Sequence, residues 1–141
     1  MTVDDVPRAA ELTMQFAERA HHPAGGNPEA VKAFLSKIVG TQDLIAFKLV
    51  HNDVITGVIF GVFGGDWLSG SKIAQELVWY TVPGERAGLI LMHHFVEEAR
   101  IRGARWVLSG YVPGFHEDRV SRVLMGLGFR EIEKWWMKEI E

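Results

Sequence analysis

The residues IAQELVWYTV (73–82), PGERAG (83–88) and LILMHHFVEEARIR (89–102) follow one another as a strand pattern, a tight turn and an amphipathic helix pattern. A glycine-containing turn that opens a helix directs backbone N–H groups and the positive end of the helix dipole toward one point. Such a point binds anions, and phosphates above all. The turn is therefore either a cradle for a phosphorylated cofactor or a plain connection between a strand and a helix.

The composition indicates an ordinary globular protein. With 141 residues, 48% of them hydrophobic, we expect one domain over 1–141 with a sizeable core. The net charge of −3 argues against a general nucleic-acid binder. The absence of cysteine excludes disulfides, thiolate metal sites and cysteine nucleophiles. The sequence shows no signal-peptide pattern and no apolar run of membrane-spanning length, so we expect no membrane contact and a cytoplasmic location.

Outward from this stretch, hydrophobic periodicity predicts an α+β chain with a mixed, mostly antiparallel sheet flanked by helices. Two strands meet at the turn pair Asn52–Asp53 as a hairpin, and the unit 73–112 contributes a parallel pair. Glycines at 57, 61 and 64 indicate bulging of the second hairpin strand or a close approach of another backbone. The expected elements are helices over 4–20, 29–39, 89–102 and 118–127, and strands over 44–51, 54–65, 73–82, 104–112, 130–133 and 134–140.

This order resembles the GCN5-related N-acetyltransferase (GNAT) superfamily. The segment ELVWYTVP is similar to that family's fourth strand, in which a carboxylate often lies seven residues before a proline, as Glu76 lies before Pro83. Arg86 takes the Gln/Arg position of the family motif V-x-P-x-x-R-G-x-G-x-G/A, and VLMGLGF (123–129) resembles the ending L-Y-x-x-x-G-F. The resemblance spans Leu44 to the C-terminus and is strongest to members encoded by bacteriophages. It implies a GNAT-like fold whose first strand is missing or rudimentary.

Two departures from the family pattern concern the expected catalytic site. The motif's glycine positions hold Ala87, Leu89 and Leu91, while Gly88 stands out of register. The loop is therefore either shortened or a degraded pyrophosphate cradle. The tyrosine that often serves as general acid in the family is replaced by Leu124.

The resemblance implies acetyl-CoA as cosubstrate, with its pyrophosphate bound by the backbone N–H groups at the helix start. It further implies that N–H groups at the end of the strand polarise the thioester carbonyl. These groups are backbone atoms, so the missing glycines restrict φ and close approach without removing the donors. The cofactor-binding residues implied in this way are Thr81, Val82, Arg86, Ala87, Gly88 and Leu89.

Glu76 is the candidate general base, because a carboxylate within an apolar strand should have a raised pKa. The alternatives are a solvent-facing residue on a half-buried strand and an acceptor for a cationic partner. For the general acid, Tyr80 and His116 are candidates by residue type, as is Tyr111, although each also fits a structural or solvated role.

No metal site is expected, because His93 and His94 are adjacent and point in different directions on a helix; one should be packed and the other exposed. Trp135 and Trp136 alternate on the last predicted strand, so one should lie in the core and the other at an interface. Sheet edges that need cover suggest a homodimer.

Two functions are consistent with these residues. The first is an acetyl-CoA-dependent N-acetyltransferase that acts on a small-molecule amine or a protein lysine. The second is a catalytically inactive GNAT-fold binding or structural protein, such as a virion-associated or host-interacting phage protein in the host cytoplasm or the virion. Glu76, Pro83 and Arg86 in register favour the enzyme, whereas the departures at Gly88 and Leu124 favour the binding protein.

Overall fold

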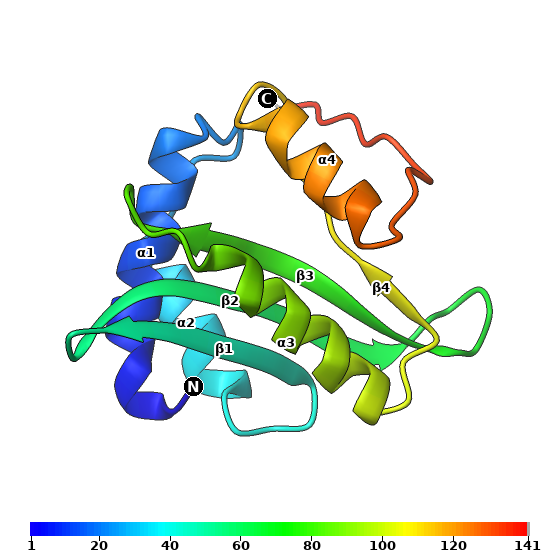
Figure 1. Ribbon diagram of the computed structural model, residues 1–141, viewed down its shortest axis with the longest axis horizontal. Coiled ribbons are helices and arrows are strands. Elements are labelled where there is room, and N and C mark those ends of the chain that lie inside the picture. Colours follow the sequence, from blue (N-terminus) through cyan, green and yellow to red (C-terminus); the bar gives the residue numbers. More distant parts are fainter. Residues whose placement is uncertain (141) are drawn as a thin grey trace. The chain divides into compact units, whose positions relative to one another are not determined.

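A computed structural model describes residues 1–140 and divides into two compact units, Met1–Gly110 and a second unit that begins at Tyr111. The first unit holds a four-stranded sheet with helices on both faces (Figure 1). Its elements are a 3-10 turn η1 (Val3–Asp5), the helices α1 (Val6–Arg19), α2 (Pro28–Ile38) and α3 (Gly88–Ile101), and the strands β1 (Leu44–His51), β2 (Val54–Gly65), β3 (Lys72–Thr81) and β4 (Trp106–Leu108). The second unit contains α4 (Glu117–Gly126).

The sheet is mixed and mostly antiparallel, as predicted. Its strand order is β1-β2-β3-β4, in which β1, β2 and β3 pair antiparallel and β4 runs parallel to β3. The hairpin between β1 and β2 turns at Asn52 and Asp53, whose φ angles of 50° and 61° lie in the left-handed region that a tight hairpin turn requires. Within the described residues no strand precedes α1, in agreement with the expectation of a missing first strand.

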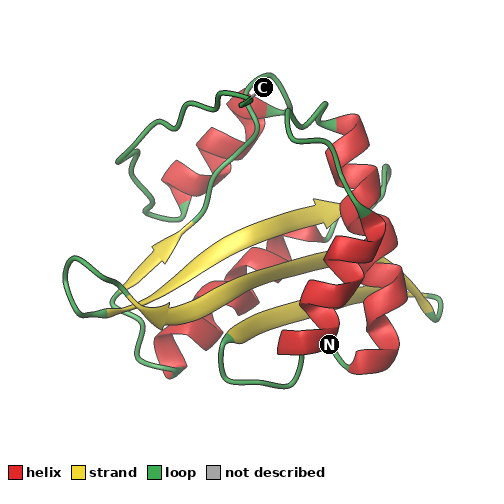
Figure 2. Cartoon of the chain, turned by 180° about the vertical axis from the view of Figure 1, so that it is seen from behind, coloured by secondary structure: helices red, strands yellow, loops and turns green. Residues whose placement is uncertain are grey.

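The helices cover the two faces of the sheet separately. The helices α1 and α2 lie on one face, seen from behind in Figure 2, and α3 lies on the other. Apolar side chains of α1, α2 and the strands form the main core, among them Leu12, Leu35, Phe60 and Tyr80. The opposite layer is built on the buried side chains Leu91, Met92, Phe95 and Ala99 of α3. Two apolar layers thus enclose the sheet and fix the register of its strands.

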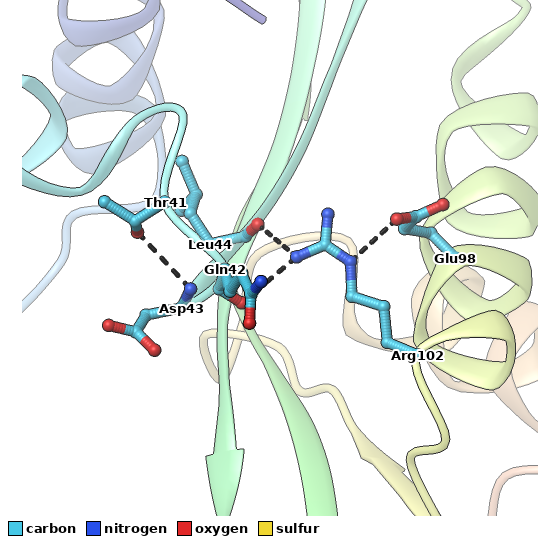
Figure 3. Close-up of polar contacts among 6 residues, drawn as sticks. All are labelled: Thr41, Gln42, Asp43, Leu44, Glu98 and Arg102. Carbon is cyan, nitrogen blue, oxygen red and sulfur yellow. Dashed lines mark hydrogen bonds and ion pairs between the residues drawn. The ribbon is translucent and has the colours of Figure 1, made fainter.

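Side-chain caps and bridges set the helix ends. The Asn27 side chain accepts a hydrogen bond from the Ala30 N–H at 3.1 Å, and Pro28 is the first residue of α2, as the sequence predicts. At the end of α3, the Arg102 guanidinium binds the carboxylate of Glu98 and the carbonyl oxygens of Gln42 and Leu44 (Figure 3). This bridge ties the last turn of α3 to the start of β1.

Two predicted strand regions differ in the structure. The strand expected over 104–112 spans only three residues, because β4 pairs with β3 only from Trp106 to Leu108. Residues 130–140 form no strand, although two were expected there, and both Trp135 and Trp136 are exposed, at 87% and 95%. Alternation of side chains is insufficient for a strand when no described strand pairs with the segment, since a strand needs hydrogen bonds to a neighbour. The prediction that one of the two tryptophans lies in the core is therefore wrong, and the prediction of an interface stays a prediction.

Candidate active site

Glu76 lies in the middle of β3 and makes a specific, partly buried contact. Ser109, the residue after β4, donates its hydroxyl to Glu76 Oε2 at 2.8 Å. Burial raises the pKa of the Glu76 carboxyl to about 7, while the hydrogen bonds from the Ser109 hydroxyl and the Gly110 N–H act in the opposite direction. A carboxyl with a pKa near neutrality can accept and release a proton at physiological pH.

A β-bulge places Glu76 at this point of the strand. Gly61 of β2 pairs with Glu76, whereas the preceding residue Phe60 pairs with Val78, so Leu77 is the extra residue of the bulge. A Cβ atom at Gly61 would lie 2.8 Å from the Cα of Glu76 and would collide with the Gln75 carbonyl oxygen. Only glycine permits this close approach. The prediction that a glycine in this strand marks a bulge or a close backbone contact is confirmed at Gly61.

The strands β3 and β4 separate beside Glu76. Their pairing ends at Gln75 and Leu108, so the edge of β3 beyond that point pairs with no strand of Met1–Gly110. Consecutive peptide groups along a strand point to opposite edges. The Val82 N–H donates to the Thr56 carbonyl of β2 at 2.8 Å, so it is not available to a ligand. The N–H of the preceding residue, Thr81, therefore points toward the open edge of β3. Of the two N–H groups predicted to donate to the thioester carbonyl, only that of Thr81 is directed toward the open edge.

The turn after β3 holds the start of α3 close to the strand. Gly84 has a φ of 88°, which allows the chain to reverse after Pro83. The indole N–H of Trp79 donates to the Gly88 carbonyl at 2.9 Å, and a Cβ at Gly88 would lie 3.0 Å from Cγ2 of Thr81. Gly88, which stands out of register with the family motif, thus has a packing role here: it lets α3 begin directly against the end of β3.

The carboxylate of Glu85 caps this turn. It accepts hydrogen bonds from the Ala87 N–H and the Thr56 hydroxyl, both at 2.9 Å, and a further one from the Arg86 N–H. The first of these bonds is the main reason that the pKa of Glu85 is lowered. Two predicted cofactor-binding groups, the N–H groups of Arg86 and Ala87, are therefore already bound to a carboxylate of the same chain.

The N–H groups of Gly88 and Leu89 remain available at the helix start. Among the described residues neither donates to a backbone or side-chain acceptor. The turn that precedes them lines an open hollow of about 340 Å³, whose residues are His51, Thr56, Val82, Gly84, Glu85 and Arg86 and include neither Gly88 nor Leu89. The first turn of α3 can therefore offer two N–H donors and a partial positive charge to an anion.

The candidate general acids lie in different surroundings. Tyr80 is 6% exposed and belongs to the core on the α1 and α2 face, and its buried hydroxyl has no hydrogen-bond partner among the described residues. A substrate would reach this hydroxyl only through that core. His116 is an exposed residue of the second unit with a left-handed φ of 50°, and it precedes α4. In the same unit the Tyr111 hydroxyl bonds Glu117, and desolvation is the first cause of its raised pKa.

The structure offers no constellation of metal ligands within residues 1–140. His93 and His94 are both exposed, in contrast to the expectation of one packed histidine. The ring of His94 lies against that of Phe47, with 5.5 Å between the ring centroids. None of the helices within residues 1–140 is long and apolar enough to cross a membrane.

Comparison with solved structures identifies the architecture. An aminoglycoside N-acetyltransferase, AAC(6')-Iy, bound to a bisubstrate analogue of CoA superposes with a TM-score of 0.77 at 19% identity, covering 100% of this chain and 95% of that one. A predicted acetyltransferase from Clostridium acetobutylicum with acetyl-CoA gives 0.76 at 14% identity, covering 99% and 92%. An acetyltransferase from Trypanosoma brucei gives 0.73 at 16%, covering 99% and 96%. The chain has a GNAT-like fold. No family model and no curated protein matches the sequence.

With the GNAT-like fold established, the predicted site residues divide into four groups. Glu76, Thr81, Gly88 and Leu89 lie on β3 and the start of α3, and Val82, Arg86 and Ala87 lie near them with their N–H groups already bonded. Tyr80 lies in the core, and His116 belongs to the second unit. Ser109, Thr56 and Glu85 were not predicted. Their partners lie far along the chain, since Ser109 and Glu76 are 33 residues apart and Thr56 and Glu85 are 29 apart.

Proposed function

We propose that the protein is an acetyl-CoA-dependent N-acetyltransferase with Glu76 as its general base. The observation that carries the proposal is the carboxyl of Glu76, whose pKa burial raises to about 7, at the point where β3 and β4 separate. Solved proteins of this fold include an acetyltransferase with acetyl-CoA and an aminoglycoside N-acetyltransferase with CoA. We further propose that the chain acts as one domain, since those structures match nearly its whole length.

The residues at the start of α3 fit a phosphorylated cosubstrate. The N–H groups of Gly88 and Leu89 have no partner among the described residues and would bind phosphate oxygens, with Arg86 supplying positive charge. The N–H of Thr81 at the open edge of β3 would donate to the thioester carbonyl. When bound, acetyl-CoA would supply the acetyl group as a thioester.

Glu76 would move the proton that amine acetylation releases. Its ionised carboxylate would accept a proton from the acceptor ammonium, so that the nitrogen lone pair can attack the carbonyl carbon. A pKa of about 7 places the ionisation of Glu76 near neutral pH, so the ionised base is available there. Ser109 would hold the carboxylate in place through its hydroxyl. We assign no residue to protonation of the leaving thiolate.

The Glu76→Gln variant tests this function. We expect acetyl-CoA-dependent turnover to fall by roughly 10²-fold or more, the usual contribution of a general base, while the acetyl-CoA Kd measured by calorimetry stays the same. Turnover can be followed as thiol release with a panel of a polyamine, an aminoglycoside, a lysine peptide and an arylalkylamine. The exposed Glu29→Gln variant is the control.

Two results would contradict the proposal. Unchanged turnover in the Glu76→Gln variant would remove the residue from catalysis. Absence of acetyl-CoA binding to the unaltered protein at millimolar concentration would favour the alternative, a catalytically inactive binding module. One observation favours that alternative: Glu85 already binds the N–H groups of Arg86 and Ala87.

A further inference from the structure

The Glu85 carboxylate is held by donors of the kind that bind phosphate. The Ala87 N–H and the Thr56 hydroxyl bond its two oxygens at 2.9 Å each, and the Arg86 N–H adds a third contact. His51 Nδ1 lies 3.7 Å from Oε2. Only 9% of the Glu85 side-chain surface is exposed. Backbone N–H groups before a helix, joined by a hydroxyl, form an anion-binding concavity, and here the anion belongs to the chain itself.

The hollow around this carboxylate has the charge pattern of an anion site. Its lining includes Arg86 and His51, and Glu85 is its only acidic residue. The donors come from separate segments: His51 ends β1, Thr56 lies in β2, and Arg86 and Ala87 precede α3. If the carboxylate moved away, an incoming phosphate would meet two N–H groups and one hydroxyl, with Arg86 and His51 in the lining of the same hollow.

The remaining donors of the turn lie directly beyond this carboxylate. The N–H groups of Gly88 and Leu89 follow that of Ala87 along the chain and have no partner among the described residues. A phosphate bound there would lie close to the negative charge of Glu85. Like charges at short distance in a partly buried site repel one another strongly, so the carboxylate opposes phosphate binding even without occupying these two donors.

We propose that the Glu85 carboxylate is an internal substitute for a phosphate group, which fills part of the anion site at the start of α3 and weakens the binding of phosphorylated ligands there. The inference rests on the proposed function for the identity of the ligand, acetyl-CoA. It assigns to Glu85 a role in setting the affinity for that ligand. In this view the chain itself has partly filled the anion site of the turn.

The variants Glu85→Gln and Glu85→Ala test this role by calorimetry with CoA and, separately, with inorganic pyrophosphate. Glutamine keeps an acceptor oxygen for the Ala87 N–H but removes the charge, whereas alanine leaves the donors open. We expect both variants to bind CoA more tightly than the unaltered protein, by roughly three- to tenfold at low salt. We also expect the alanine variant to bind pyrophosphate more tightly.

A second measurement separates this role from a purely structural one. Without ligand, both variants should unfold at a lower temperature, because they lose hydrogen bonds to the carboxylate. Lower stability combined with tighter binding is not expected of a residue that only supports the fold. The gain in affinity should shrink as salt rises, since it is Coulombic. Glu29→Gln, which removes an exposed charge from the first turn of α2, should leave the CoA affinity unchanged.

The results distinguish failure of this inference from failure of the proposed function. If CoA binds the unaltered protein as tightly as both variants, or more tightly, the inference is overturned and the function stands. If CoA binds no variant while pyrophosphate binds Glu85→Ala more tightly than the unaltered protein, the inference stands and the function fails. If neither ligand binds any variant, both are overturned.

Discussion

At the scale of single residues, the pair Glu76–Ser109 decides the proposed chemistry. Burial raises the pKa of Glu76, and the Ser109 hydroxyl partly offsets that rise by donating to the ionised form. The two effects set the pKa to about 7, where a base is most useful at neutral pH. In the proposed mechanism Ser109 is thus a positioning residue that acts through Glu76.

We predict that Ser109→Ala moves the pH dependence of turnover. Loss of the hydrogen bond destabilises the ionised Glu76, so its pKa rises and the acid limb of the kcat/KM profile moves to higher pH by roughly half to one pH unit. Ser109→Thr retains a hydroxyl and should keep a profile near that of the unaltered protein. A profile that stays in place in the alanine variant would show that Ser109 does not act on the base.

The raised pKa of the Glu76 carboxyl should also make the stability of the protein depend on pH. Because the folded-state pKa of Glu76 lies above its ordinary value of 4.5, the folded state binds more protons than the unfolded state between the two values. The contribution of Glu76 to stability is therefore most favourable below pH 4.5 and is lost as the pH rises through about 7. The cost of ionisation at pH 8 is on the order of 3 kcal/mol.

We predict that Glu76→Gln raises the free energy of unfolding at pH 8 by up to about 3 kcal/mol relative to the unaltered protein, and by much less at pH 5. Urea unfolding at the two pH values measures the difference. An equal effect at both pH values would mean that the carboxyl is not held at a raised pKa in the folded protein.

At the scale of elements, contact between β3 and the first residue of α3 fixes the turn. The Trp79 indole holds the Gly88 carbonyl, and Thr81 Cγ2 occupies the space next to the Gly88 Cα. The N–H groups at the helix start are therefore aimed by packing rather than by the glycine spacing of the family motif. The direction of these donors is a property of the strand–helix contact.

We predict that Gly88→Ala destabilises the protein by roughly 1–2 kcal/mol, because its Cβ would lie 3.0 Å from Thr81 Cγ2 and force a shift. Thr81→Ser removes that methyl group, so the double variant Gly88→Ala/Thr81→Ser should recover most of the loss. Thermal unfolding of the two single variants and the double variant gives the coupling energy. Additive effects would contradict a direct steric contact.

At the scale of the whole molecule, the C-terminal segment 130–140 carries apolar side chains without cover in the described residues. The exposed residues include Ile132, Trp135, Trp136, Met137 and Ile140. Large exposed apolar groups in a row are unfavourable in water and mark surfaces that associate. The alternation of the segment is that of a strand in need of a partner.

We predict that this segment pairs with that of a second copy in a homodimer. Light scattering coupled to size exclusion should give the mass of a dimer at micromolar concentration, and the double variant Trp135→Lys/Trp136→Lys should give a monomer. The exposed Trp67→Lys variant, which lies in the loop before β3, is the control and should remain dimeric. A monomer at all concentrations would exclude this association.

The sequence predicted most of the secondary structure, because its signals are local. The Asn27 cap, Pro28 at the first helical position and the Asn52–Asp53 turn each depend on residues within one turn of chain. The predictions failed where a strand depends on a distant partner. Hence β4 is shorter than expected, and residues 130–140 form no strand.

The sequence by itself determined the strand, turn and helix of 73–102 and placed Glu76 in an apolar strand before the turn. Only the tertiary structure decided what those groups can do. Burial and Ser109 set the pKa of Glu76, the Thr56 carbonyl of β2 accepts the Val82 N–H, and the Thr56 hydroxyl holds the carboxylate of Glu85 at the turn. The physical reason is range: periodicity and caps act over a few residues, whereas burial and hydrogen-bond partners come from segments about 30 residues away.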